Sequence, residues 1–200
     1  MTQNVPSIAH PARWPAMSGS DQRPGIRPRP TLGRRLDIAA RRAFPVTCTI
    51  VLMLLTELPF GFAAQTALLP ALTFGCVWFW SVYRPTAMPP PLVFLTGLLL
   101  DLLGYLPLGV GVLTLLCIHG AAVRWRRFLV QQGFAMTWLA FVPVAMLASA
   151  LSWGLTALLG FRLIPAGPAA FQATLAAALY PALAIPLARA HRSVADPERA

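Results

Sequence analysis

Six long apolar segments separated by short connections limit the fold of this chain more than any other feature. They are 17 to 26 residues long, and a helix that crosses a membrane needs about 20 apolar residues, with a lower limit near 17. The six segments are 44–60, 62–83, 89–105, 107–123, 134–159 and 168–188. The sequence therefore predicts an all-α integral membrane protein built as a six-transmembrane-helix bundle.

Composition agrees with a membrane protein. Only 11% of the residues are charged, whereas a soluble domain has about 25%. The net charge of +10 comes from arginines placed beside apolar segments, so we expect membrane lipid rather than nucleic acid as their surroundings. The three cysteines, at positions 48, 76 and 117, each lie inside an apolar run without CxxC spacing and are typical of small buried hydrophobes.

The arginines predict the orientation of the six segments. Loops rich in arginine stay in the cytoplasm, and alternate connections of this chain are rich or poor in arginine. With six crossings and both termini in the cytoplasm, 15 of the 16 arginines lie on the cytoplasmic side, and only Arg162 lies outside. The connections on the outer side are short, so we expect a multi-pass membrane protein with little mass outside the membrane.

The chain divides into three parts by composition. Residues 1–42 form an Arg/Pro-rich cytoplasmic tail that we expect to be disordered, residues 43–190 form the membrane domain, and residues 191–200 form a short cytoplasmic tail. Within the first tail, residues 31–42 carry apolar side chains at helical spacing. They suit either an interfacial helix on the inner leaflet or a frayed start of the first span.

One carboxylate, Asp101, stands inside the apolar run 89–111. Helical geometry predicts that it lies about 15 Å deep, near the bilayer centre, and on one helix face with Gly97, Gly104 and Tyr105. A charge at this depth is costly, so its role is to hold the helices of this bundle together, to dock a partner helix, or to bind a proton or ion. We favour helix contact, since a proton relay needs several titratable groups. We expect Asp101 to be either neutral or bonded to hydroxyl and amide groups. The side chains that we expect as its partners are those of Thr96, Thr114, Gln65 and Gln172.

The remaining polar side chains in the spans suggest structural roles. Glu57 lies near the outer end of the first segment, where a site shared with Asp101 is the functional alternative, and Gln65 and Gln172 suit hydrogen bonds between helices. His119 is typical of an interfacial or hydrogen-bonded histidine. Four arginines are expected topology anchors, with binding of anionic lipid or of a cytoplasmic partner as the alternative: Arg84, Arg124, Arg126 and Arg127. No catalytic pair, metal-ligand set or nucleotide motif stands out, so we expect neither an enzyme nor a cofactor.

Residues 78–115 resemble the rod shape-determining protein MreD family. The resemblance rests on Gly-Leu-Leu-Leu-Asp-Leu-Leu at 97–103, on Pro-Leu-Gly at 107–109, and on the preceding Phe-Trp-Ser-Val-Tyr-Arg-Pro at 79–85. Asp101, Pro107 and Gly109 fall on the most recognisable positions of the family. The long Arg/Pro-rich tail departs from the family pattern, so nothing carries over to it.

The resemblance implies a non-enzymatic scaffold of the bacterial inner membrane that takes part in cell elongation, the regulation of cell shape and lateral peptidoglycan synthesis. Its implied partners are the bitopic protein MreC, the actin-like MreB and a glycosyltransferase–transpeptidase pair. The residues expected to pack against partner helices are Gly97, Asp101, Gly104, Pro107 and Gly109.

Two other functions remain as alternatives. MreD-like proteins are similar in fold to the substrate-binding membrane subunits of energy-coupling-factor transporters, so a small-molecule transporter subunit is the second hypothesis. A membrane enzyme such as a lipid-modifying hydrolase is the third, and the lack of Ser/His or paired His/Asp sets disfavours it.

Overall fold

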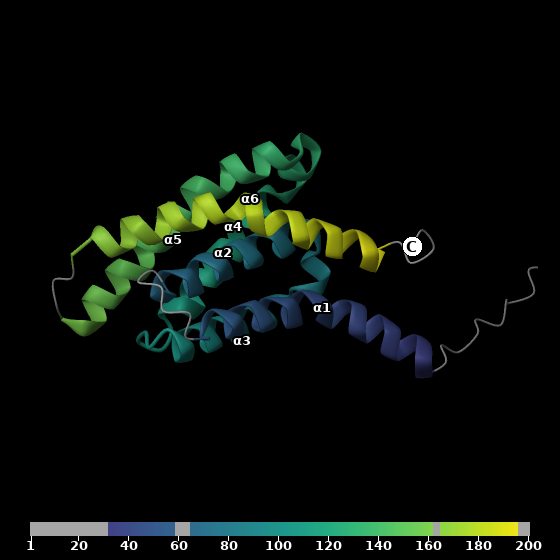
Figure 1. Cartoon of the computed structure of the whole chain (residues 1–200), viewed down its shortest axis with the longest axis horizontal. Helices are drawn as coiled ribbons and strands as arrows, with labels where there is room; N and C mark the ends of the chain where they lie inside the picture. The colour runs from purple at the N-terminus through teal and green to yellow at the C-terminus, as the bar shows by residue number, and fades with distance from the viewer. Residues whose placement is uncertain (1–31, 59–64, 162–164, 196–200) are drawn as a thin grey trace, which may run out of the picture.

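The chain folds into helices. The computed structural model describes residues 32–58, 65–161 and 165–195, and in these residues it contains six α-helices, one short 3-10 helix and no strand (Figure 1). The helices are α1 (Leu32–Thr56), α2 (Gln65–Tyr83), η1 (Pro85–Ala87), α3 (Pro90–Leu103), α4 (Val110–Gln132), α5 (Phe134–Gly160) and α6 (Gly167–Ala195). Each predicted apolar segment overlaps one α-helix, which confirms the all-α class.

Three of the helices are long and apolar enough to cross a membrane. They are α2, α5 and the part of α6 over Gly167–Ala190. The apolar part of α1, Ala43–Thr56, and α3 are shorter. At 1.5 Å per residue, the 14 residues of α3 extend about 21 Å, less than the thickness of the hydrocarbon core.

The helix ends differ from the predicted segment ends at several places. Pro107 does not begin the fourth helix, because α4 starts at Val110 after Gly109, whose φ of +102° is left-handed. At its other end α4 runs nine residues beyond position 123, since no glycine or proline interrupts it before Gly133. The predicted segment ends at position 123 because Arg124 ends the run of apolar residues. Arginine is nevertheless a good helix former, so the helix itself continues past it.

The two predicted tails are partly helical. Residues 32–42 belong to α1 and continue without a break into its apolar half, so they form a continuous lead-in to that half rather than a separate helix. Residues 1–31, including most of the predicted disordered tail, lie outside the described residues. At the other end α6 continues to Ala195, five residues into the predicted 191–200 tail.

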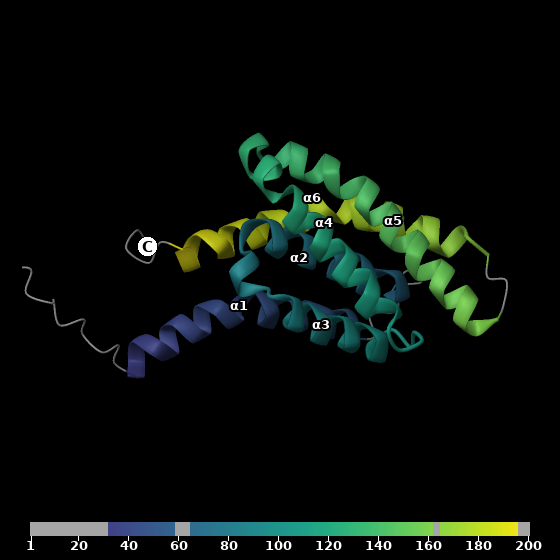
Figure 2. The same cartoon turned by 180° about the vertical axis from the view of Figure 1, so that it is seen from behind.

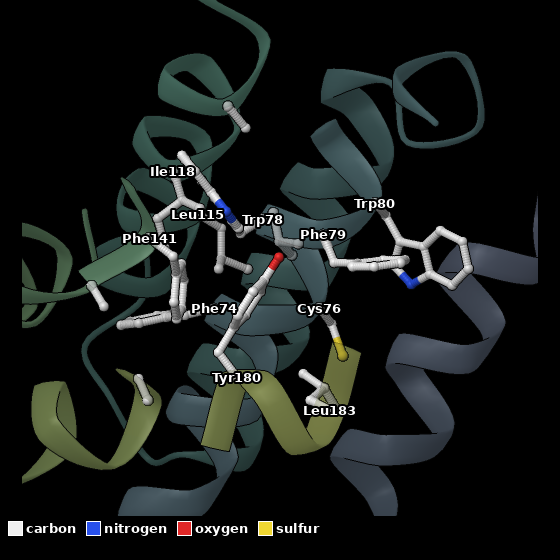
Figure 3. Packing of buried hydrophobic residues seen from close by; sticks show 14 of the residues in the cluster. Phe74, Cys76, Trp78, Phe79, Trp80, Leu115, Ile118, Phe141, Tyr180 and Leu183 are labelled. Atoms are coloured by element: carbon white, nitrogen blue, oxygen red, sulfur yellow. The ribbon is translucent and has the colours of Figure 1, made fainter. Parts of the chain in front are cut away.

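Helix α2 lies at the centre of the molecule and contacts each of the other five α-helices. Its second half is buried on all sides, including Trp78 and Trp80, which are fully buried. Around it, Leu115 and Ile118 of α4, Phe141 of α5 and Tyr180 of α6 complete the core (Figure 3). Phe141 stacks on Tyr180 with ring centroids 4.6 Å apart. A helix buried all round needs no polar face, which explains why the second half of α2 is almost entirely apolar.

The outer helices show the opposite pattern, with large apolar side chains turned outward. Leu147 is 71% exposed and Leu158 is 68% exposed on α5, and Phe171 and Ile185 are exposed on α6. A soluble protein rarely leaves such a continuous apolar surface in water. Together with the three long apolar helices, this surface identifies a membrane protein.

Two prolines inside helices leave backbone carbonyls without their usual partners, and side chains from other helices supply replacements. Pro181 cannot donate to the carbonyl of Ala177, and Trp138 Nε1 of α5 donates to that carbonyl at 2.9 Å. Pro45 likewise frees the carbonyl of Arg41, which accepts from Arg84 Nη1 at 3.5 Å. Such replacement matters most in hydrocarbon, where water is absent.

The first and last helices place their free ends on the same side of the molecule. The N-terminal end of α1 (purple) and the C-terminal end of α6 (yellow) extend towards the same end of the bundle in both views (Figures 1 and 2).

Candidate functional site

Asp101 lies in the last turn of α3 and is buried, with 1% of its surface exposed. Helix α3 ends at Leu103, because Gly104 takes the C-cap position and Tyr105 has a left-handed φ of 50°. Asp101 is therefore next to the α3–α4 connection, close to the end of its helix.

The carboxylate of Asp101 is bonded to the start of α4. Oδ2 accepts from the backbone N–H of Gly109 at 2.7 Å, and Oδ1 accepts from the backbone N–H of Gly111 at 2.6 Å. The first N–H groups of a helix have no acceptor within that helix, and they form the positive end of its dipole. Asp101 thus caps α4 from the neighbouring helix.

The four side chains expected as partners of Asp101 have other roles. The hydroxyl of Thr96 donates to the carbonyl of Leu92, and that of Thr114 to the carbonyl of Val110, each within its own helix. Gln65 Nε2 donates to the carbonyls of Thr56, the last residue of α1, and of Leu58 just after it, and Gln172 Nε2 is buried without a partner in the part of the chain that the structure describes. The true partners are backbone groups, which residue types alone do not reveal.

Two glycines allow α3 and α4 to approach this closely. A Cβ on Gly97 would lie 2.5 Å from the Cα of Val112, and a Cβ on Gly111 would lie 2.6 Å from Asp101 Oδ1. Neither distance is possible for a real side chain, so both positions require glycine. The prediction that another helix approaches at Gly97 is confirmed. Gly111 was missed, although it stands in the same glycine-rich run as Gly109.

The other predicted packing residues form the turn between the two helices. Gly104 caps α3, Pro107 accepts from the N–H of Val110 at 3.2 Å, and Gly109 supplies the left-handed N-cap of α4. Tyr105, which is 94% exposed, and Leu108 project from this turn. All five predicted packing residues therefore belong to one hairpin, which we call the α3–α4 hairpin (residues 90–132).

Glu57 and Gln65 meet at the end of α1. Gln65 Nε2 donates to the carbonyls of Thr56, at 3.0 Å, and Leu58, at 2.6 Å, which confirms its expected role between helices. Glu57 is exposed and lines a cavity of about 300 Å³ with Gln65, Thr66 and Tyr105. Asp101 does not line this cavity, and both of its carboxylate oxygens accept from the backbone of Gly109 and Gly111 instead.

The four predicted anchor arginines fall into two pairs. Arg126 Nε donates to the carbonyl of Val82 at 2.8 Å, at the C-terminal end of α2, and Arg84 reaches the carbonyl of Arg41 as described above. Arg124 and Arg127 are exposed. Half of the set therefore holds helices together inside the molecule.

The buried His119 is hydrogen-bonded, as expected of a structural histidine. Its Nδ1 lies 2.8 Å from Ser81 Oγ, between α4 and α2. Ser81 is fully buried, so the pair has no surface from which a substrate could reach the hydroxyl. Among the residues that the structure describes, no group of three His, Cys, Asp or Glu side chains is placed to hold a metal.

Comparisons of the chain with family models, with curated proteins and with solved structures find no match. The class of the protein therefore follows from the geometry alone. It is an all-helical membrane protein whose most elaborate polar site joins two of its own helices.

Proposed function

We propose that this chain is a non-enzymatic scaffold subunit of the bacterial cell-elongation machinery, of the MreD type. In this proposal it crosses the inner membrane six times, has both termini in the cytoplasm, and binds an MreC-like bitopic protein. Contacts with an MreB-like protein and with a glycosyltransferase–transpeptidase pair belong to the same proposal.

One observation carries the scaffold assignment. Both carboxylate oxygens of Asp101 accept hydrogen bonds from the backbone of α4. Both oxygens of this buried carboxylate therefore accept hydrogen bonds that join α3 to α4, and neither oxygen is left to bind a substrate or an ion. A residue of this kind maintains the shape of a surface, which is what a scaffold requires.

The six-span topology has separate support. The free ends of α1 and α6 extend towards the same end of the bundle, as an even number of crossings requires. Arg84 and Arg126 lie at the end where α2 finishes, and the arginine-poor turn at Tyr105 follows the end of α3. This arrangement matches the rule that arginine-rich connections stay in the cytoplasm.

The partner proposal is tested by co-purification with an MreC-like protein from cells. Because Gly97 and Asp101 are buried, a partner cannot touch them, and substitutions there act by moving the hairpin. We expect Gly97→Leu and Asp101→Leu to weaken co-purification at least severalfold. Gly120→Leu is the matched control, since Gly120 lies exposed on α4 with open space around it.

A second pair of variants tests the outward face of the hairpin. Tyr105→Ser and Leu108→Ser remove exposed apolar groups and should leave the fold unchanged. We expect them to reduce partner binding while the melting temperature stays within a degree or two of the wild-type value. Full binding by all four hairpin variants would refute the hairpin as the partner surface.

A transporter subunit remains the second candidate because of the cavity at the end of α1. Glu57, Gln65 and Thr66 give it polar lining, as a substrate site requires. Native mass spectrometry of the purified protein tests this function. A small molecule that is retained by the wild type and lost in Glu57→Gln and Thr66→Ala would favour the transporter and count against the scaffold.

A further inference from the structure

A second cavity lies at the opposite end of the bundle from Glu57. It has a volume of about 430 Å³ and is formed by three helices that are distant in sequence. Phe79 and Tyr83 come from the end of α2, Phe134 from the start of α5, and Ala184, Ile185, Ala188 and Arg189 from α6. We call it the Arg189 cavity.

The walls of the Arg189 cavity are aromatic and firmly held. Phe79 and Tyr83 contact each other with ring centroids 4.7 Å apart. Phe134 stacks in parallel on Tyr180, with centroids 6.1 Å apart and planes within 6°. Phe79 is buried and belongs to the central core. The cavity is thus a feature of the packed bundle, and we do not expect it to close by movement of side chains.

The cavity joins an apolar surface to a single positive charge. Ile185 and Phe134 are about half exposed, so the cavity opens towards the apolar outer surface of α5 and α6. Arg189 is exposed and belongs to the lining. An acyl chain can therefore enter from the hydrocarbon while an attached headgroup stays beside the guanidinium.

Among the side chains that the structure describes, none supplies a counter-charge to Arg189. The acidic ones among them are Glu57 and Asp101, which lie at the ends of α1 and α3, far from the end of α2. Arg84 and Arg126, at the same end as Arg189, donate to carbonyls, whereas Arg189 makes no such bond to the residues that the structure describes. Guanidinium groups bind phosphate oxygens in a two-pronged geometry, and basic pockets between membrane helices bind anionic headgroups.

We propose that the Arg189 cavity binds one anionic phospholipid, with its acyl chain against Phe79 and Phe134 and its phosphate on Arg189. The site is independent of the proposed scaffold function, since it involves neither the α3–α4 hairpin nor a protein partner. A bound lipid would join α2, α5 and α6 at one end of the bundle.

The test compares three probes added to the full-length protein in detergent: phosphatidylglycerol, phosphatidylcholine with the same acyl chains, and inorganic phosphate. We expect phosphatidylglycerol to raise the melting temperature by several degrees, phosphatidylcholine to raise it less, and phosphate to leave it unchanged. Native mass spectrometry should show one retained phosphatidylglycerol per chain. An equal rise with inorganic phosphate would overturn the proposal, because it would indicate a site for free phosphate.

Two matched pairs of variants locate the site. Arg189→Gln should lower the affinity for phosphatidylglycerol roughly tenfold, whereas Arg127→Gln, an exposed arginine outside the cavity, should not. Ala188→Phe fills the cavity and should remove bound lipid of either kind, whereas Ala182→Phe, exposed on the same helix, should not. An unchanged preference for phosphatidylglycerol in Arg189→Gln, or an equal loss in Arg127→Gln, would overturn the proposal. If Ala188→Phe does not fold, the comparison of Arg189→Gln with Arg127→Gln still tests the proposal.

Discussion

At the scale of single residues, bonds from side chains to proline-freed carbonyls join the helices of this bundle. Trp138 Nε1 donates to the carbonyl of Ala177 on α6, which has no intrahelical partner because Pro181 lacks an N–H. We expect Trp138→Phe to lower the free energy of unfolding by about 1 kcal/mol, as other hydrogen bonds between membrane helices do. In a Pro181→Ala background the restored N–H can satisfy the carbonyl, so the same substitution should cost less. A double-mutant cycle in detergent measures this coupling.

A parallel cycle with Arg84→Met and Pro45→Ala serves as the comparison. Here the donor–acceptor distance is 3.5 Å, against 2.9 Å for Trp138, so the coupling should be smaller. Equal costs of Trp138→Phe with and without Pro181 would show that the indole contributes by packing alone.

Two glycines of α4 should respond in opposite directions to the same substitution. A methyl group on Gly111 would meet Asp101 Oδ1 at 2.6 Å, so Gly111→Ala should destabilise the protein by roughly 2 kcal/mol or more. Gly120 has open space around it, so Gly120→Ala should gain up to about 1 kcal/mol from helix propensity. Thermal unfolding should show a lower melting temperature than the wild type for Gly111→Ala and a higher one for Gly120→Ala. Similar shifts for both would mean that α3 and α4 are not in close contact at Gly111.

At the scale of elements, the α3–α4 hairpin depends on a carboxylate that caps a helix from outside it. Asp101→Leu removes both acceptors and leaves the N–H groups of Gly109 and Gly111 unpaired, so we expect a loss of about 2–5 kcal/mol. Asp101→Asn keeps one acceptor oxygen and should lose about half as much. Denaturant unfolding measures the loss of stability in each variant. An Asp101→Leu variant as stable as the wild type would contradict the capping role.

The sequence predicts the elements better than their ends and contacts. Six apolar segments correspond to six helices, because hydrophobic length determines where helices lie. At Asp101 the expected bonding to amide groups is confirmed, but the four candidate partners are wrong. The partners are the backbone N–H groups of Gly109 and Gly111, and every residue type except proline offers such a group. The prediction succeeded at Gly97, where a residue without a Cβ beside an acid predicts close approach. Arg84 and Arg126 show the same limit, because an arginine that bonds a carbonyl looks in sequence like an arginine at the membrane surface.

At the scale of the whole molecule, the proposed topology predicts which positions reach water on each side. A cysteine at Tyr105 should lie outside the cell, and one at Arg127 should lie inside. The native Cys117, exposed on α4 within its apolar half, should face hydrocarbon.

Labelling with a thiol reagent tests these locations. In a background with the other cysteines replaced, a membrane-impermeant maleimide applied to intact cells should label Tyr105→Cys alone. Arg127→Cys should be labelled only after the cells are permeabilised, and Cys117 should resist labelling in both conditions, because a charged, water-soluble maleimide does not enter the surrounding hydrocarbon. Labelling of Arg127→Cys in intact cells would reverse the orientation, and rapid labelling of Cys117 would mean that α4 does not cross the membrane. The outcome also bears on the Arg189 cavity, since Arg189 and Arg126 lie at the same end of the bundle, where a cytoplasmic location would bring the cavity to the leaflet richest in anionic lipid.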